Sequence, residues 1–208
     1  MKLLTVGISG ASCSGKTSVA SKLEKMLPWC SVINQDKYYH GEDSCHHVRS
    51  GNLINWEVLE AFDMNRMKED ISTVSQNLLM RKTLSGQPGS GHTTALKSMK
   101  IRNSPVLIIE GIVIFKDPDL VTLCDRKYFV EIDQATCKAR RENRVWDPEG
   151  DNWVESPEYF EKVAWPEYLD CVEEMKKLPG LNFLDSNVSS IEANFDHIFG
   201  DIVDILQV

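Results

Sequence analysis

Residues 10–17 read GASCSGKT, which has the full phosphate-binding pattern G-x-x-x-x-G-K-[ST]. An apolar run, LLTVGI at 3–8, comes just before it, and an amphipathic helix pattern begins near Lys16. In this strand, turn and helix setting, Gly10 and Gly15 allow backbone N–H groups to curl around phosphate oxygens at a helix N-terminus. We expect a nucleotide site in which Lys16 reaches the β- and γ-phosphates and the Thr17 hydroxyl binds Mg²⁺.

A second glycine-rich stretch, GQPGSGHTT at 86–94, imitates this pattern with His92 in place of the lysine. No buried strand leads into it, and a mostly neutral imidazole is too short to replace Lys16 on a γ-phosphate. We therefore predict no second site and interpret the segment from Thr83 to Ser104 as a flexible surface loop. Its length leaves a substrate-covering role open.

Five short apolar runs have the length and β-branched content of buried parallel strands; they occupy residues 3–8, 31–34, 106–110, 127–132 and 181–185. Helical stripes lie between and after them. Their apolar members are Val19, Leu23, Met26 and Leu27; Met64, Met67, Ile71, Val74 and Leu78; and Ile191, Phe195, Ile198, Phe199, Ile202 and Val203. Alternating strands and helices predict an α/β fold whose ligands bind at the carboxyl ends of the strands.

Composition narrows the possible partners. The 208 residues carry a net charge of −8, which argues against binding along a nucleic-acid backbone or to an anionic membrane surface. No apolar stretch approaches the roughly 20 residues of a membrane span. The six cysteines show no C-x-x-C spacing, so we expect reduced thiols in a soluble, cytoplasmic protein.

Two carboxylates are expected beside the phosphate loop. In NQDKYY, Asp36 follows the second strand, where it could take a proton from an attacking hydroxyl and help hold Mg²⁺, although a capping role is the plain alternative. Tyr38 and Tyr39 could form a wall of a substrate pocket. Glu110 ends the third strand in the position of a Walker B acid, where an ion is costly unless it faces a metal or a pocket.

The segment CKARRENRVWDPEG predicts a basic helix broken by a turn after Trp146. On such a helix Arg140 and Arg144 share a face, while Arg141 projects about 100° away. We interpret it as a lid that stabilises a transferring phosphoryl group; a solvated basic face paired with Glu142 is the alternative.

The chain resembles the nicotinamide riboside kinases, a branch of the uridine-kinase-like P-loop kinases. The resemblance is carried, in order and spacing, by VGISGASCSGKTS, CSVINQDKYY, WEVLEAFDM, LIIEG, RRENRVW and WPEYL, and only the glycine and serine loop and residues 41–49 look unmatched. It implies one three-layer P-loop kinase domain over 1–208, with a five-stranded parallel sheet and a helical lid at about 138–156. It also implies transfer of the ATP γ-phosphate, with Mg²⁺, to the ribose 5'-hydroxyl of nicotinamide riboside for NAD synthesis.

The resemblance also implies roles for residues. Asp36, Lys16 and Glu110 would be catalytic, with Asp36 as general base, and Thr17 and Asp36 would hold the metal. The expected ATP-binding residues are Gly10, Ala11, Ser12, Cys13, Ser14, Gly15, Lys16, Thr17, Ser18, Arg140, Arg144, Val188, Ser189 and Ser190. The expected substrate-binding residues are Asp36, Lys37, Tyr38, Tyr39, Trp56, Glu57, Arg141, Trp146 and Asp147. ATP and pyridine ribosides are the expected partners of a monomer.

The pocket departs from the familiar vertebrate pattern, in which two tyrosines sandwich the nicotinamide ring and an aspartate holds the ribose. Trp56, Trp146 and Glu57 stand at these positions, and tryptophan stacks well on a pyridinium cation. Two other functions remain open: a uridine or cytidine kinase, although those relatives carry Asp-His-Pro where this chain has INWEVLE, and a nucleotide-binding scaffold without catalysis.

Overall fold

The computed structural model describes residues 2–85, 104–144 and 156–207. Its main sheet has the strand order β2-β5-β1-β6-β7, and every neighbouring pair is parallel. The strands are β1 (Leu4–Gly10), β2 (Cys30–Asn34), β5 (Val106–Glu110), β6 (Arg126–Glu131) and β7 (Leu181–Asp185). The predicted five-stranded parallel sheet is confirmed, and each strand begins and ends within two residues of its expected bounds.

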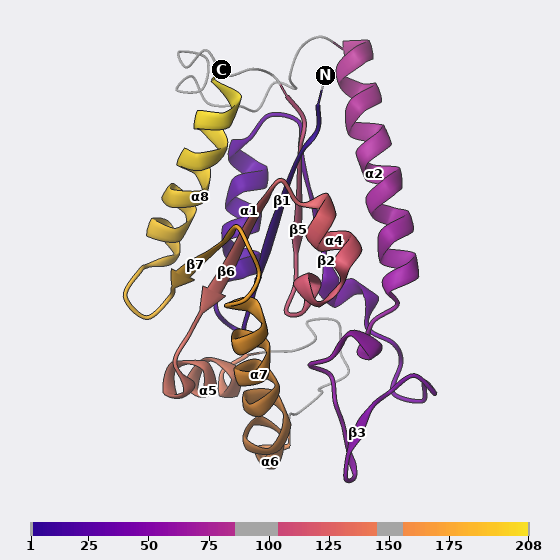
Figure 1. The fold of residues 1–208 in the computed structure, drawn as a ribbon, viewed down its shortest axis with the longest axis vertical. Helices are drawn as coiled ribbons and strands as arrows, with labels where there is room; N and C mark the ends of the chain where they lie inside the picture. Colours follow the sequence, from indigo (N-terminus) through magenta and orange to yellow (C-terminus); the bar gives the residue numbers. More distant parts are fainter. Residues whose placement is uncertain (1, 86–103, 145–155, 208) are drawn as a thin grey trace.

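Helices cover both faces of this sheet (Figure 1). One face carries α1 (Lys16–Met26) and α8 (Ile191–Leu206), and the other carries α2 (Met64–Ser85), α4 (Pro118–Leu123) and α7 (Trp165–Met175). Smaller elements complete the described chain: α5 (Gln134–Glu142), α6 (Pro157–Tyr159), the 3₁₀ turns Gln35–Tyr38, Leu59–Ala61 and Ile114–Lys116, the π-helical turn Phe160–Ala164, and the hairpin of β3 (Arg49–Ser50) and β4 (Leu53–Ile54).

Side chains alternate between the two faces along each central strand, as a strand requires. In β6, Tyr128 and Val130 pack with α1 and α8, whereas Phe129 packs with the helices opposite. In β5, Ile108 and Leu107 divide in the same way. The sheet is therefore buried on both faces, which explains why its strands appear in the sequence as continuous apolar runs.

Helix α2 corrects one boundary. The loop predicted from Thr83 begins later, because α2 continues through Ser85. Nothing before Gly86 stops the helix, since threonine, leucine and serine are all tolerated in a helical turn and the first glycine comes only at 86. The glycine-rich stretch 86–94, with His92, lies outside the described residues.

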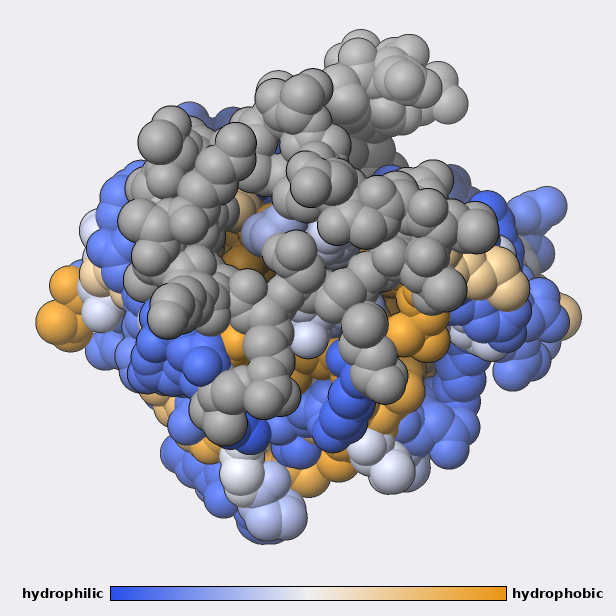
Figure 2. All heavy atoms as spheres, turned by 90° about the horizontal axis from the view of Figure 1, so that it is seen from above, coloured by the Kyte–Doolittle hydropathy of each residue, from blue (hydrophilic) through white to orange (hydrophobic). Residues whose placement is uncertain are grey.

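Two expectations from composition can be compared with the described chain. No described helix is both long and apolar enough to cross a membrane. All six cysteines are free thiols. Figure 2 shows hydrophilic residues over most of the described surface at one end of the molecule, with hydrophobic groups between them, which is ordinary for a globular domain.

Candidate active site

The phosphate loop joins β1 to α1, and its two glycines adopt backbone angles that other residues rarely reach. Gly10 has φ of 135° and Gly15 has φ of 97°. A Cβ atom on Gly10 would lie 2.2 Å from the carbonyl oxygen of Val130 in the neighbouring strand. Both positions therefore need glycine: Gly15 for its backbone turn, and Gly10 for its backbone turn and its close approach to β6.

Lys16 begins α1 and is buried, with its Nζ donating a hydrogen bond of 2.6 Å to the Ala11 carbonyl. Burial lowers the pKa of Lys16, and the nearby carboxylates of Glu110 and Asp36 oppose that shift. An ammonium group held in this way gains most from a further anion, because little water is left to solvate it.

Glu110 ends β5 and is 2% exposed. Its Oε1 accepts a hydrogen bond of 2.9 Å from the Thr17 hydroxyl. Burial raises the pKa of Glu110, the Asp36 charge raises it further, and Lys16 opposes both. The predicted position of Glu110 beside the phosphate loop is thus seen in the structure.

Asp36 lies in the first turn of the 3₁₀ helix that follows β2. The cap of that turn is Asn34, whose side chain accepts a 2.7 Å hydrogen bond from the Asp36 backbone N–H. Since a neighbour does the capping, the Asp36 carboxylate is available for another contact, and its Oδ2 lies 3.4 Å from Nη2 of Arg144. This geometry removes the main argument for the capping alternative.

The basic helix α5 ends at Glu142, earlier than predicted, so Arg144 lies beyond it. Asn143 closes the helix, and the backbone N–H of Arg144 turns back to the Arg141 carbonyl. The prediction that Arg140 and Arg144 share one face of a helix is therefore wrong, because Asn143 ends the helix before Arg144. Both guanidinium groups still reach the phosphate loop, from Arg140 to the Cys13 carbonyl at 3.2 Å and from Arg144 to the Ser12 hydroxyl at 3.1 Å.

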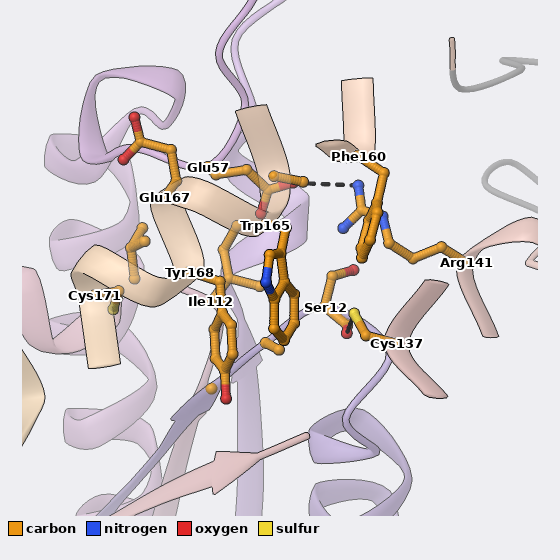
Figure 3. Close-up of a pocket in the computed structure, with 14 residues that line it drawn as sticks. Ser12, Glu57, Ile112, Cys137, Arg141, Phe160, Trp165, Glu167, Tyr168 and Cys171 are labelled. Atoms are coloured by element: carbon orange, nitrogen blue, oxygen red, sulfur yellow. Dashed lines mark hydrogen bonds and ion pairs between the residues drawn. The ribbon is translucent and has the colours of Figure 1, made fainter. Parts of the chain in front are cut away.

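Arg141 points the other way, as predicted. Its Nη2 lies 3.2 Å from Oε1 of Glu57, and the two side chains are 5% and 12% exposed. The guanidinium carbon lies 5.9 Å from the ring centroid of Tyr159 and 6.0 Å from that of Phe160. Figure 3 shows the ion pair with Phe160 beside it. Arg141 is held by an anion and two rings rather than by a solvated surface.

Two large cavities lie at this edge of the sheet, beside the much smaller one, of about 20 Å³, whose lining Figure 3 shows. The first, which we call the donor cavity, has a volume of about 340 Å³ and is lined by the phosphate loop together with Glu110, Arg140 and Ile191. The second, which we call the acceptor cavity, has a volume of about 350 Å³ and is lined by aromatic and charged side chains from several segments. They have four lining residues in common: Ser12, Asp36, Tyr39 and Arg144. Asp36 and Arg144 therefore lie where the contents of the two cavities would meet.

Several predicted site residues lie elsewhere. Lys37 is exposed and absent from both cavity linings. Tyr38 is 4% exposed and donates its hydroxyl to Asp70 at 2.8 Å, so it is a core residue and does not line the acceptor cavity. Tyr38 ends the 3₁₀ turn Gln35–Tyr38 with its side chain in the core, whereas Tyr39, the residue that follows the turn, lines the cavity.

The predicted adenine residues follow β7 at the edge of the donor cavity. Val188 is 86% exposed, and Ser190 caps α8 through the Ala193 N–H. The next residue, Ile191, lines the cavity. The structure thus brings this segment close without placing Val188, Ser189 or Ser190 in the lining. Trp146 and Asp147 lie outside the described residues.

Sequence reasoning missed part of the acceptor cavity, namely His40, Gly41, Glu42 and Tyr159. Residues 40–42 directly follow Tyr39, so their place in the chain was a signal that could have found them. Tyr159 had no such signal. Its hydroxyl accepts a hydrogen bond of 2.9 Å from the Trp56 backbone N–H, a contact that only the folded chain reveals.

Comparison with known proteins shows which family the chain resembles. Residues 5–186 match the phosphoribulokinase / uridine kinase family. Nicotinamide riboside kinase 1 of Rattus norvegicus is 34% identical over 209 residues, which cover 100% of this chain and 97% of that protein. A uridine kinase of Borreliella burgdorferi (strain ZS7) is 32% identical over 165 residues, covering 78% of each chain. The solved tunicamycin resistance protein of Deinococcus radiodurans has a similar fold, with a TM-score of 0.53 at 11% identity over 97% of this chain and 96% of that one.

Proposed function

The chain belongs to the phosphoribulokinase / uridine kinase family, and we propose that it transfers the γ-phosphate of ATP to the ribose 5'-hydroxyl of nicotinamide riboside. The product is the mononucleotide used in NAD biosynthesis, and nicotinic acid riboside is a second acceptor. One observation carries the proposal: the donor and acceptor cavities meet at Asp36 and Arg144. The relatives named nicotinamide riboside kinase support the choice of acceptor.

At the junction, Asp36 serves as the general base that takes the proton of the ribose hydroxyl. Arg144 lies beside it and stabilises negative charge on the transferring phosphoryl group. Arg140 contacts the phosphate loop at Cys13 and acts on the same nucleotide. An Asp36–Arg144 contact of 3.4 Å is long enough to be exchanged for contacts to substrate.

The donor side suits Mg²⁺. The Thr17 hydroxyl uses its proton on Glu110, so its oxygen keeps lone pairs for a cation. Burial and the Asp36 charge raise the pKa of Glu110, and a nearby cation would oppose that rise. Among the described residues, no three His, Cys, Asp or Glu side chains form a metal cluster of their own. That is typical of Mg²⁺ held by one or two protein groups and by phosphates, and Thr17 and Asp36 are the proposed ligands. When bound, the ion would neutralise phosphate charge.

The acceptor side suits a pyridinium riboside. Trp56 and Tyr39 line it, and a tryptophan face is the strongest partner among side chains for a cationic ring. The Arg141–Glu57 pair also lines the cavity and offers donors and an acceptor for ribose hydroxyls. Trp146 and Asp147 remain proposed members of this pocket. The proposed state is a cytoplasmic monomer.

A uridine kinase is the specific alternative, supported by the Borreliella relative. A coupled ADP-release assay with ATP and Mg²⁺ separates the two functions when nicotinamide riboside, nicotinic acid riboside, uridine and cytidine are compared at equal concentration. We expect the pyridine ribosides to be turned over at least about tenfold faster, the discrimination that a cation–π contact supplies. Equal turnover of uridine would overturn the choice of substrate.

The Asp36→Ala variant tests the other alternative, in which the chain binds a nucleotide without catalysing a reaction. Loss of the general base should lower kcat by about 10²- to 10⁴-fold while ATP binding, followed by a fluorescent analogue, changes little. Unchanged ATP-dependent turnover would contradict the mechanism. The control is Asp70→Asn, which alters a carboxylate that binds Tyr38 outside both cavities and should leave kcat close to its starting value.

A further inference from the structure

Residues 40–47, HGEDSCHH, form a histidine loop at the mouth of the acceptor cavity. Backbone hydrogen bonds hold this loop, from His40 N–H to the Ala61 carbonyl at 2.9 Å and from Ser44 N–H to the Gly41 carbonyl at 3.0 Å. His40 and His46 stack with ring centroids 5.0 Å apart. The loop therefore has a defined shape, and its first three residues line the cavity.

The histidine loop also fixes Trp56. Nε2 of His47 donates to the Gly41 carbonyl at 2.7 Å, because a carbonyl can only accept. The His47 ring then lies 4.5 Å from Trp56 at an interplanar angle of 70°, while Tyr39 contacts Trp56 at 5.7 Å and 84°. Trp56 therefore contacts both a ring of the histidine loop and the Tyr39 ring, which ties the loop to this wall of the cavity.

Among the described residues, the charged side chains that line the acceptor cavity do not balance. Three carboxylates (Asp36, Glu42 and Glu57) face two guanidinium groups (Arg141 and Arg144), which leaves one negative charge in excess when His40 is neutral. Asp36 pairs with Arg144, and Glu57 pairs with Arg141. In the part of the chain that the structure describes, Glu42 has no cationic partner. The excess negative charge thus belongs to the histidine loop.

We propose that Glu42 makes the acceptor cavity discriminate by charge, so that it prefers nicotinamide riboside to nicotinic acid riboside. This inference rests on the proposed function. Both ribosides carry a cationic pyridinium ring, but the nicotinic acid form adds a carboxylate. Glu42 attracts the first base and repels the carboxylate of the second, while Trp56 stacks on either ring.

The test measures kcat/KM for both ribosides with saturating ATP and Mg²⁺. The starting protein should favour nicotinamide riboside, and Glu42→Gln should lower that preference roughly fivefold, as expected for two charges about 6 Å apart in a partly solvated cavity. The change should lie in KM rather than kcat, since Glu42 is proposed to act on binding of the base and not on phosphoryl transfer. Because Glu42 is exposed, raising the ionic strength should weaken the preference in the starting protein and not in the variant.

Asp43→Asn is the matched control, because it removes the same charge from the neighbouring position, which does not line the cavity. It should leave the preference unchanged. The inference is overturned if Glu42→Gln keeps the starting preference, if Asp43→Asn lowers it equally, or if the starting protein favours nicotinic acid riboside. Each of these results is read from measurable turnover of both ribosides, so the proposed function would survive them; if nicotinamide riboside is not turned over, the proposed function fails first.

Discussion

Removing Glu57 should destabilise the protein through Arg141. The two side chains are 3.2 Å apart and 12% and 5% exposed, so their attraction at an effective dielectric constant of about 20 is roughly 5 kcal/mol before desolvation. Breaking a buried pair typically costs about 3 to 5 kcal/mol because the remaining charge stays buried. The rings of Tyr159 and Phe160 still hold Arg141, so we take about 3 kcal/mol for Glu57→Ala. For a chain of this length that lowers Tm by about 6 to 12 °C, measured by circular dichroism.

Two controls separate burial from charge. Glu161→Ala breaks an exposed pair with Lys138, whose side chains are 48% and 44% exposed and 2.7 Å apart, and should change Tm by less than about 2 °C. Replacing both buried partners, Glu57→Leu with Arg141→Met, should recover most of the lost Tm without recovering activity, since no unpaired charge remains. If Glu57→Ala melts within about 2 °C of the starting protein, the pair is solvated and the reasoning is refuted.

Three further predictions concern single side chains. Burial raises the pKa of Glu110 above its ordinary value of 4.5. The free energy of unfolding therefore falls as pH rises from the ordinary pKa to the raised one. Glu110→Gln should therefore raise Tm of the ligand-free protein at about pH 7, with the gain vanishing below pH about 4.3, yet lower turnover at least about 10²-fold. Gly10→Ala places a Cβ 2.2 Å from the Val130 carbonyl oxygen and should prevent recovery of folded protein; a variant with unchanged Tm would disprove the close approach. Trp56→Ala should raise KM for nicotinamide riboside about tenfold with KM for ATP unchanged, and Trp56→Phe should restore most of the loss.

The sheet was predictable because burial on both faces leaves a strong local signal. Four of the five residues of β5 are apolar, β1 is buried along its whole length, and the phosphate loop after β1 depends on glycines at fixed spacing. Glu110 was predictable for the same reason, since a charge at the end of an apolar strand is anomalous unless a site explains it. These inferences need only a few neighbouring residues.

The arginines show where local reasoning stops. Helical periodicity correctly separated Arg141 from Arg140, but it extended the helix to Arg144, which lies past the Asn143 turn. Arg144 nevertheless contacts Ser12, because a turn closed by the Arg141 carbonyl directs the chain back over the phosphate loop. The prediction that Tyr38 lines the substrate pocket is also wrong. Its hydroxyl donates to Asp70 on α2, which is 32 residues away in sequence.

The acceptor cavity depends most on distant partners, which explains why its selectivity could not be predicted from spacing. Trp56 occupies an expected position, yet its orientation is set by His47, Tyr39 and the Tyr159 hydroxyl, which come from three separate segments. The donor cavity is built on one loop and a strand end, and its chemistry is that of phosphate. We therefore expect selectivity for the acceptor to reside in the lining residues that depart from the family pattern, which include Trp56, Glu57 and the histidine loop. A variant of Glu42 should change which riboside is chosen, whereas a variant of Lys16 should slow every riboside alike.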